Sequence, residues 1–166
     1  MNSDLIKTIE EAKELRKADE LEDSQELLLS LLDSNPDEPI VLFEVGGSYD
    51  VMGYEEEAIP FYRQAIEAGL DGPDLLECLI CLGISQRAIG EAEQAVEVLE
   101  SARDQFPEDS AIKAFLSLAY YSDDRFEDAF QLLLELLLTT TNDKQLLEYS
   151  DTLDYFRENL DEVWED

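Results

Sequence analysis

The stretch LFEVGGSYDVMGYEEEAIPFYRQA, residues 42–65, decides the fold of this chain. It has a small residue at Gly46, a second at Ala58 twelve positions later, and a large apolar residue at Tyr62 four positions after that. The pattern occurs three more times, at spacings of 34, 37 and 34 residues between successive copies. A period of this size predicts stacked helical hairpins. The other copies read Ala12, Ser24 and Leu28; Gly83, Ala95 and Leu99; and Ser117, Ala129 and Leu133.

The repeated small residues have a packing role. A glycine such as Gly46 lets two antiparallel helices approach closely, the second small residue faces it, and the large residue fills the space beside them. Proline follows the second helix because it cannot continue one. Asp37, Asp74 and Asp109 are expected to cap the first helices. The predicted helices are 4–18, 21–33, 38–52, 55–68, 74–89, 91–104, 109–122 and 125–139.

The period and its residues resemble the tetratricopeptide repeat (TPR). The resemblance covers roughly residues 5–143 and implies an all-α fold, a right-handed α-solenoid of about four TPR hairpins plus a C-terminal capping helix. We expect a single TPR domain over 1–166, with repeats at about 5–38, 39–72, 76–109 and 110–143. Copy two carries the resemblance most fully, with Leu42, Val45, Gly46, Tyr49, Ala58, Tyr62 and Ala65.

Residues 144–164 are predicted to form a ninth helix outside the repeats. Its apolar residues recur every three or four positions and make one stripe. One interpretation is a cap that covers the last repeat by packing on 125–139, because terminal repeats need a polar outer face. The other is a contact with a second copy or with a partner protein, and the possible dimer contact includes Leu160 and Trp164. The stripe consists of Leu146, Tyr149, Leu153, Phe156, Leu160 and Val163.

The charge of the chain excludes several classes of partner. Its 42 acidic and 11 basic residues give a net charge of -31, which disfavours nucleic acid and anionic membrane surfaces. The sequence has no run of 18 apolar residues, so it predicts no membrane span. Its first residues lack the basic and apolar blocks of a signal peptide. Together with only two cysteines, these features predict a cytoplasmic protein.

No residue pattern indicates an enzyme. The chain has no histidine, the usual general base near neutral pH, and it lacks a glycine-rich phosphate loop. We therefore expect no catalytic residue, no cofactor and no metal site. Cys78 and Cys81 form a C-x-x-C pair, but a zinc site needs four ligands. The favoured interpretation is that they are buried or line the groove.

The resemblance also implies a binding groove, because first helices line the concave face in this family. Of 24 positions assigned to that face by spacing, four are basic and four acidic, whereas the other 142 hold seven basic and 38 acidic residues. The groove is therefore expected to be neutral and largely apolar, with cations able to pair with a partner carboxylate. The residues predicted to bind are Arg16, Lys17, Phe43, Gly47, Ile80, Ile84, Arg87, Ala114, Leu118 and Tyr121.

The predicted function is a non-enzymatic scaffold that binds a peptide or helix of a partner protein in this groove. One alternative is a small acidic TPR chaperone for a secreted or membrane-active client. Another is a self-associating structural protein. Clamping of a heat-shock chaperone's terminal carboxylate is disfavoured, because the lysine-asparagine set is missing at the matching positions, which are Ile9, Lys13, Glu44, Gly47 and Ile80.

Overall fold

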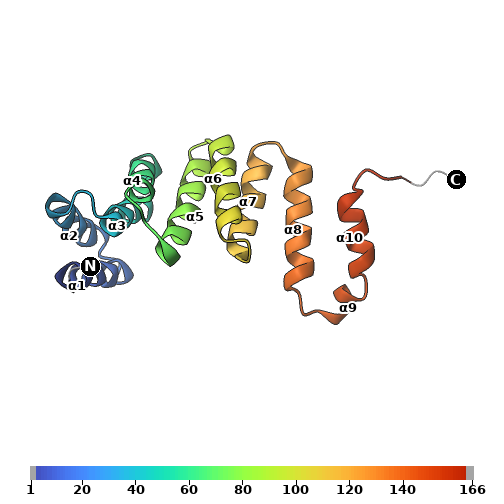
Figure 1. The fold of residues 1–166 in the computed structure, drawn as a ribbon, viewed down its shortest axis with the longest axis horizontal. Helices are drawn as coiled ribbons and strands as arrows, with labels where there is room; N and C mark the ends of the chain where they lie inside the picture. The colour runs from blue at the N-terminus through green and yellow to red at the C-terminus, as the bar shows by residue number, and fades with distance from the viewer. Residues whose placement is uncertain (1–2, 164–166) are drawn as a thin grey trace. The chain divides into compact units, whose positions relative to one another are not determined.

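The computed structural model describes residues 3–163, and every regular element that these residues form is an α-helix (Figure 1). Helices make up 78% of the chain, which confirms the all-α prediction. The eight repeat helices begin and end within two residues of their predicted bounds. In chain order, the helices are α1 Ser3–Lys17, α2 Leu21–Ser34, α3 Pro39–Asp50, α4 Glu55–Glu67, α5 Gly72–Ala88, α6 Ala92–Gln105, α7 Ser110–Ser122, α8 Phe126–Thr140, α9 Lys144–Leu147 and α10 Ser150–Glu158.

The helices belong to two compact units, one ending at Glu91 and the other beginning at Ala92. In the N-terminal unit, each of α1 to α4 packs against the next helix, and α3 also contacts α5. In the C-terminal unit, α6 packs on α7, α7 on α8, and α8 on α10. Packing between sequential helices is what a hairpin repeat requires. The boundary falls inside the third predicted repeat, and the single-domain assignment stays a prediction.

The turn inside each hairpin contains one residue with a left-handed backbone conformation. Asp19, Gly53, Gly90 and Asp124 have φ angles of 66°, 79°, 88° and 59°. They follow α1, α3, α5 and α7, and they are spaced by the same 34, 37 and 34 residues as the packing pattern. In each turn, the N–H of the residue after the left-handed one donates to the carbonyl oxygen five residues earlier, as in Tyr54 N to Tyr49 O at 3.0 Å. This hydrogen bond is the one that closes a Schellman motif.

The predicted packing of small residues is confirmed in all four copies, because every one of them is buried. In the first copy, the Ser24 hydroxyl donates to the Ala12 carbonyl at 2.8 Å. In the second, a Cβ added at Gly46 would lie 2.8 Å from the Tyr62 ring. The large residue is fully buried in three copies, but Leu133 is 52% exposed. The prediction that Leu133 fills a core space is therefore wrong.

The C-terminal helix differs from the prediction. Instead of one helix over 144–164, the described part of the chain forms α9 and α10, separated by a turn in which Tyr149 is 64% exposed. The Asn159 N–H donates to Phe156 O, and its side-chain amide donates to Tyr155 O, so α10 ends there. Helix α10 packs on α8 as predicted. Leu160 is 36% exposed, and Trp164 lies outside the described residues.

Only one of the three predicted caps is confirmed. The Asp109 carboxylate accepts from Ile112 N at 2.9 Å and caps α7. Asp37 and Asp74 were wrongly assigned, because α3 starts at Pro39 after Glu38, and α5 starts at Gly72 after Asp71. Proline at the first helical positions fixes these two starts.

Candidate functional site

A cavity of about 330 Å³ opens in the N-terminal unit. Its wall comes from α1, α3 and α5, the first helices of their hairpins, with one residue from α4. This is the arrangement that the repeat pattern predicts for a binding surface. The residues that line the cavity are Lys13, Arg16, Lys17, Phe43, Glu44, Gly47, Asp50, Val51, Tyr62, Glu77 and Cys81.

A buried carboxylate lies at the base of the cavity. The Glu44 side chain is only 3% exposed, and it lies 2.9 Å from Lys13 Nζ and 3.0 Å from an Arg16 guanidinium nitrogen. The same Arg16 nitrogen also donates to the Glu44 carbonyl at 3.4 Å. Two cations from α1 thus neutralise one anion from α3, which is how proteins keep a buried charge stable.

The charge network raises the pKa of Lys13. Partial burial works to lower the pKa of its ammonium group, but the hydrogen bond from Lys13 to Glu44 and the negative charge of that residue act in the opposite direction. Glu10 and Asp74 add to this attraction, and the pKa of Lys13 is raised overall. Lys13 therefore remains a cation at this surface.

A second polar group joins three helices. Asp50 accepts a hydrogen bond from the Tyr62 hydroxyl at 2.9 Å and one from the Ser85 hydroxyl at 3.2 Å. Burial raises the pKa of Tyr62 far above its usual value, and the negative charge of Asp50 acts in the same direction. Tyr62 therefore stays neutral and ties α4 to α3, and its ring contacts Phe43 at a centroid distance of 6.0 Å.

Open space remains beside Gly47. A Cβ built there would meet only the Arg16 guanidinium, at 3.5 Å, which is ordinary contact. The buried Arg16 Nε has no hydrogen-bond acceptor among the described residues. Val51, at the end of α3, is 49% exposed and adds apolar surface. The cavity thus combines a guanidinium group, free space and an apolar edge.

The structure brings together four of the ten predicted groove residues. Arg16, Lys17, Phe43 and Gly47 line the cavity, although Phe43 is 6% exposed and acts mainly as core. The other six do not line it. Ile80 and Ile84 are half-buried and Arg87 is exposed on α5, while Ala114, Leu118 and Tyr121 lie on α7 in the C-terminal unit.

The sequence analysis missed Glu44, which lies at the centre of the charge network. It assigned Glu44 to the groove by spacing but did not predict it to be a binding residue. The signal was present, because Glu44 is the one carboxylate inside the apolar run from Pro39 to Ser48. A charged residue in such a run is buried and must be paired. Lys13 and Arg16 lie three residues apart on α1, so one face of that helix presents both cations.

The two cysteines behave as the sequence indicated. Cys78 is buried, and its Sγ donates to the Tyr62 carbonyl at 3.6 Å, whereas Cys81 lines the cavity. Burial raises the pKa of the Cys78 thiol from 9.0 to about 12 and that of Cys81 to about 11. Both are therefore thiols, with low reactivity, near neutral pH. Residues 3–163 hold no group of three or more metal-ligating side chains.

The raised pKa of Cys78 predicts a loss of stability at alkaline pH. The folded protein keeps this proton where the unfolded chain has lost it, so the contribution is complete below pH 9 and decreases as pH rises from 9.0 toward 12. Between pH 8 and about 10.5, the wild type should lose roughly 1–2 kcal/mol more than Cys78→Ser, which does not titrate. Urea unfolding at both pH values measures this. Equal losses in the two proteins would contradict the assignment.

The architecture defines a helical-repeat protein with a concave cavity formed by successive first helices. The sequence model of the tetratrico peptide repeat family matches residues 39–153, so this chain belongs to that family. Proteins of this family generally mediate protein–protein interactions. No curated protein sequence matches the chain. None of the helices in the described part of the chain is long and apolar enough to span a membrane.

Solved structures show the same fold at low sequence identity. Residues 41 to the end of MamA from Desulfovibrio magneticus RS-1 align with a TM-score of 0.72 at 14% identity, covering 98% of this chain and 99% of that one. A Podosopora anserina protein with nearly identical TPR-like repeats aligns with a TM-score of 0.72 at 18% identity, covering 96% of this chain and 89% of that one. A tetratricopeptide repeat protein from Parabacteroides merdae gives 0.72 at 18%, covering 96% of this chain and 62% of that one. These similarities concern the fold alone.

Proposed function

We propose that this protein is a non-enzymatic interaction module that binds a peptide segment of a partner protein in the cavity formed by α1, α3 and α5. The observation that carries the proposal is the cavity of about 330 Å³, whose wall holds the Arg16 guanidinium beside the open space at Gly47. A guanidinium group forms strong hydrogen bonds with oxygen acceptors. A carbonyl or carboxylate oxygen of a bound peptide would accept such a bond here.

The chemistry of the cavity suits an extended or helical peptide with mixed character. Val51 offers apolar surface. The charged residues of the lining are three cations, Lys13, Arg16 and Lys17, and three carboxylates, Glu44, Asp50 and Glu77, so the wall carries no net charge. A segment with one apolar side chain and a hydrogen-bond acceptor therefore fits better than a highly charged one.

Gly47 provides the most direct test of this cavity. Gly47→Leu would place a large side chain beside Arg16, and leucine is a good helix former, so α3 should remain intact. Gly47→Ala is the matched control, because its Cβ fits at 3.5 Å. We expect peptides selected from a random displayed library on the wild type to bind Gly47→Ala similarly and Gly47→Leu about tenfold more weakly or worse.

One result would contradict the assignment of peptide binding to this cavity. If Gly47→Leu is folded by circular dichroism and binds the selected peptides as the wild type does, the cavity is not the contact surface.

The wider groove that the sequence predicts, including Ala114, Leu118 and Tyr121, remains a proposal. So do the cytoplasmic location, the homodimer, and the chaperone and self-association alternatives.

A further inference from the structure

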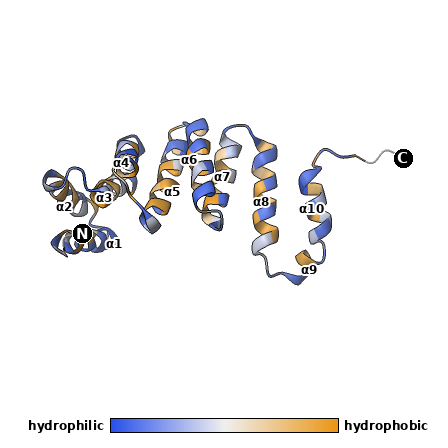
Figure 2. Cartoon of the chain, in the orientation of Figure 1, coloured by the Kyte–Doolittle hydropathy of each residue, from blue (hydrophilic) through white to orange (hydrophobic). Residues whose placement is uncertain are grey.

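One helix of the C-terminal unit exposes a continuous apolar strip. Phe126, Phe130, Leu133 and Leu137 are 54%, 52%, 52% and 45% exposed. Their spacing of four, three and four residues places them on one side of α8, and we call them the α8 apolar face. Figure 2 shows hydrophobic residues along the length of this helix. Exposed apolar patches of this kind usually mark an interaction site.

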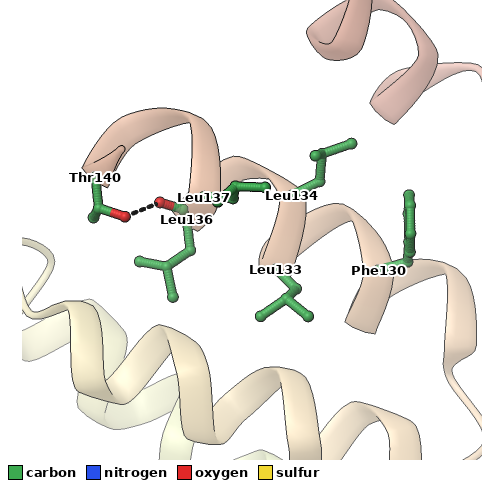
Figure 3. Close-up of a pocket in the computed structure, with 6 residues that line it drawn as sticks. All are labelled: Phe130, Leu133, Leu134, Leu136, Leu137 and Thr140. Carbon is green, nitrogen blue, oxygen red and sulfur yellow. Dashed lines mark hydrogen bonds between the residues drawn. The ribbon is translucent and has the colours of Figure 1, made fainter. Parts of the chain in front are cut away.

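The α8 apolar face borders a cavity of about 450 Å³. Among the described residues, its lining comes from α8. Figure 3 shows this face, with Leu133 and Leu136 extending toward one edge of it and Phe130 and Leu134 toward the other. The side chains are apolar except for Thr140, whose hydroxyl is already bonded to the Leu136 carbonyl at 2.6 Å. A ligand here would be recognised mainly by apolar contact.

The repeat pattern explains why this face is open. Leu28, Tyr62 and Leu99 occupy the same repeat position as Leu133, and they are 0%, 0% and 1% exposed. Each lies on a second helix that packs against the first helix of the next hairpin, as α2 does on α3, α4 on α5 and α6 on α7. After α8 no such hairpin follows in the described chain. Helix α10 packs on α8 but buries none of its own residues, and it leaves the α8 apolar face exposed.

The apolar surface continues onto α7. The Tyr121 ring packs edge-on against Phe126 at a centroid distance of 5.3 Å, and Tyr121 is itself 62% exposed. In an uninterrupted repeat array, the next first helix would pack in the angle between the preceding two helices. The exposed side chains of α7 and α8 therefore fit one amphipathic helix.

Charge decides what kind of helix fits. Residues 92–163 contain 18 acidic and five basic residues. Three of the five cations are already paired within the unit: Lys113 with Glu135, Arg125 with Glu100 and Asp128, and Arg157 with Asp154 and Glu158. Near the start of α8, Asp123, Asp124 and Glu127 add negative charge. The surroundings of the face are thus acidic.

We propose that the α8 apolar face binds an amphipathic helix with a basic polar side, supplied by another protein. This helix packs on the side chains of α8 that α10 leaves exposed. A second copy of the chain is disfavoured, because both copies carry a net charge of -31 and would repel each other. The site is separate from the cavity of the N-terminal unit and does not depend on its function.

The experiment uses a labelled designed peptide of about 18 residues, with leucine on one face and lysine on the other. Fluorescence anisotropy at about 0.15 M salt should show saturable one-to-one binding to the wild type. Phe130→Gln with Leu133→Gln should weaken it about tenfold or more. Ile6→Gln with Tyr54→Gln, at positions 44% and 49% exposed in the other unit, should leave it unchanged. The same peptide with glutamate replacing lysine should not bind.

Three results would overturn the proposal. Equal binding by the Phe130→Gln, Leu133→Gln protein would mean that overall charge alone attracts the peptide. Equal binding of the glutamate peptide would remove the role of charge. Sedimentation showing a wild-type dimer that these substitutions dissociate would assign the face to a second copy. If the double variant does not fold, Leu137→Gln alone provides the same comparison.

Discussion

Removing both cations that face Glu44 should lower the free energy of unfolding by about 3–5 kcal/mol, because it leaves a carboxylate buried without a counter-charge. The substitutions Lys13→Met and Arg16→Met keep the aliphatic stems of both side chains and remove only their charges. The Glu44 side chain is 3% exposed in its place on α3. Urea denaturation followed by circular dichroism measures the change.

Two further variants make this result specific. Lys17→Met removes an exposed pair, in which Lys17 and Glu14 are 71% and 67% exposed, so it should change stability by at most about 0.5 kcal/mol. Adding Glu44→Leu to the double variant should recover most of the loss, since the buried charge itself is then gone. A double variant as stable as the wild type would show that Glu44 is solvated, contrary to the structure.

The second large effect concerns two adjacent glycines of α3. Gly46→Ala should destabilise the protein, whereas Gly47→Ala should stabilise it. A Cβ at position 46 would lie 2.8 Å from two atoms of the Tyr62 ring and 3.3 Å from Phe61 Cβ. The ring cannot move aside, because it is fully buried and its hydroxyl is bonded to Asp50. Overpacking of this kind costs about 1–3 kcal/mol.

The same methyl group at position 47 meets only the Arg16 guanidinium at 3.5 Å. Alanine in place of a helical glycine then contributes about 0.5–1 kcal/mol. Because both variants gain the same helix propensity, the difference between their urea midpoints reports the contact with Tyr62. Equal stability of the two alanine variants would mean that α3 and α4 are not in close contact at Gly46.

Much of the fold follows from spacing in the sequence. The small residues at one repeat interval must face each other, because no larger side chain fits where two helices touch. A second signal at the same interval was present but was not used in the prediction. Asp19 and Asp124 occupy the left-handed turn position that Gly53 and Gly90 hold in the middle copies. Aspartate tolerates this conformation better than most residues, so the four turns could have been placed from the sequence.

Other features could not be read from the pattern. Leu133 fits the repeat as well as Leu99 does, but its burial depends on a following helix that packs in the same way. That information lies in the tertiary arrangement of α8 and α10. The stripe over 144–164 likewise has helical periodicity, yet the chain turns before Ser150, because periodicity does not report where a helix is interrupted.

The candidate site was predicted only in outline. The TPR resemblance implied that first helices form a groove, and the repeat spacing assigned Arg16 and Gly47 to it, where both line the cavity. It did not show that Glu44 engages Arg16 with one guanidinium nitrogen while leaving Nε without an acceptor. Such a difference between atoms of one side chain depends on packing geometry rather than on residue type.

The central claim is that partner peptides bind in the cavity between α1, α3 and α5. The most direct measurement is a nitrogen-15 NMR titration of the full chain with a peptide selected on the wild type. We predict the largest shifts of backbone amides at Arg16, Gly47 and Cys81, with little change in α2. The largest shifts on the outer helices α2 and α4, with Gly47 unchanged, would contradict the account.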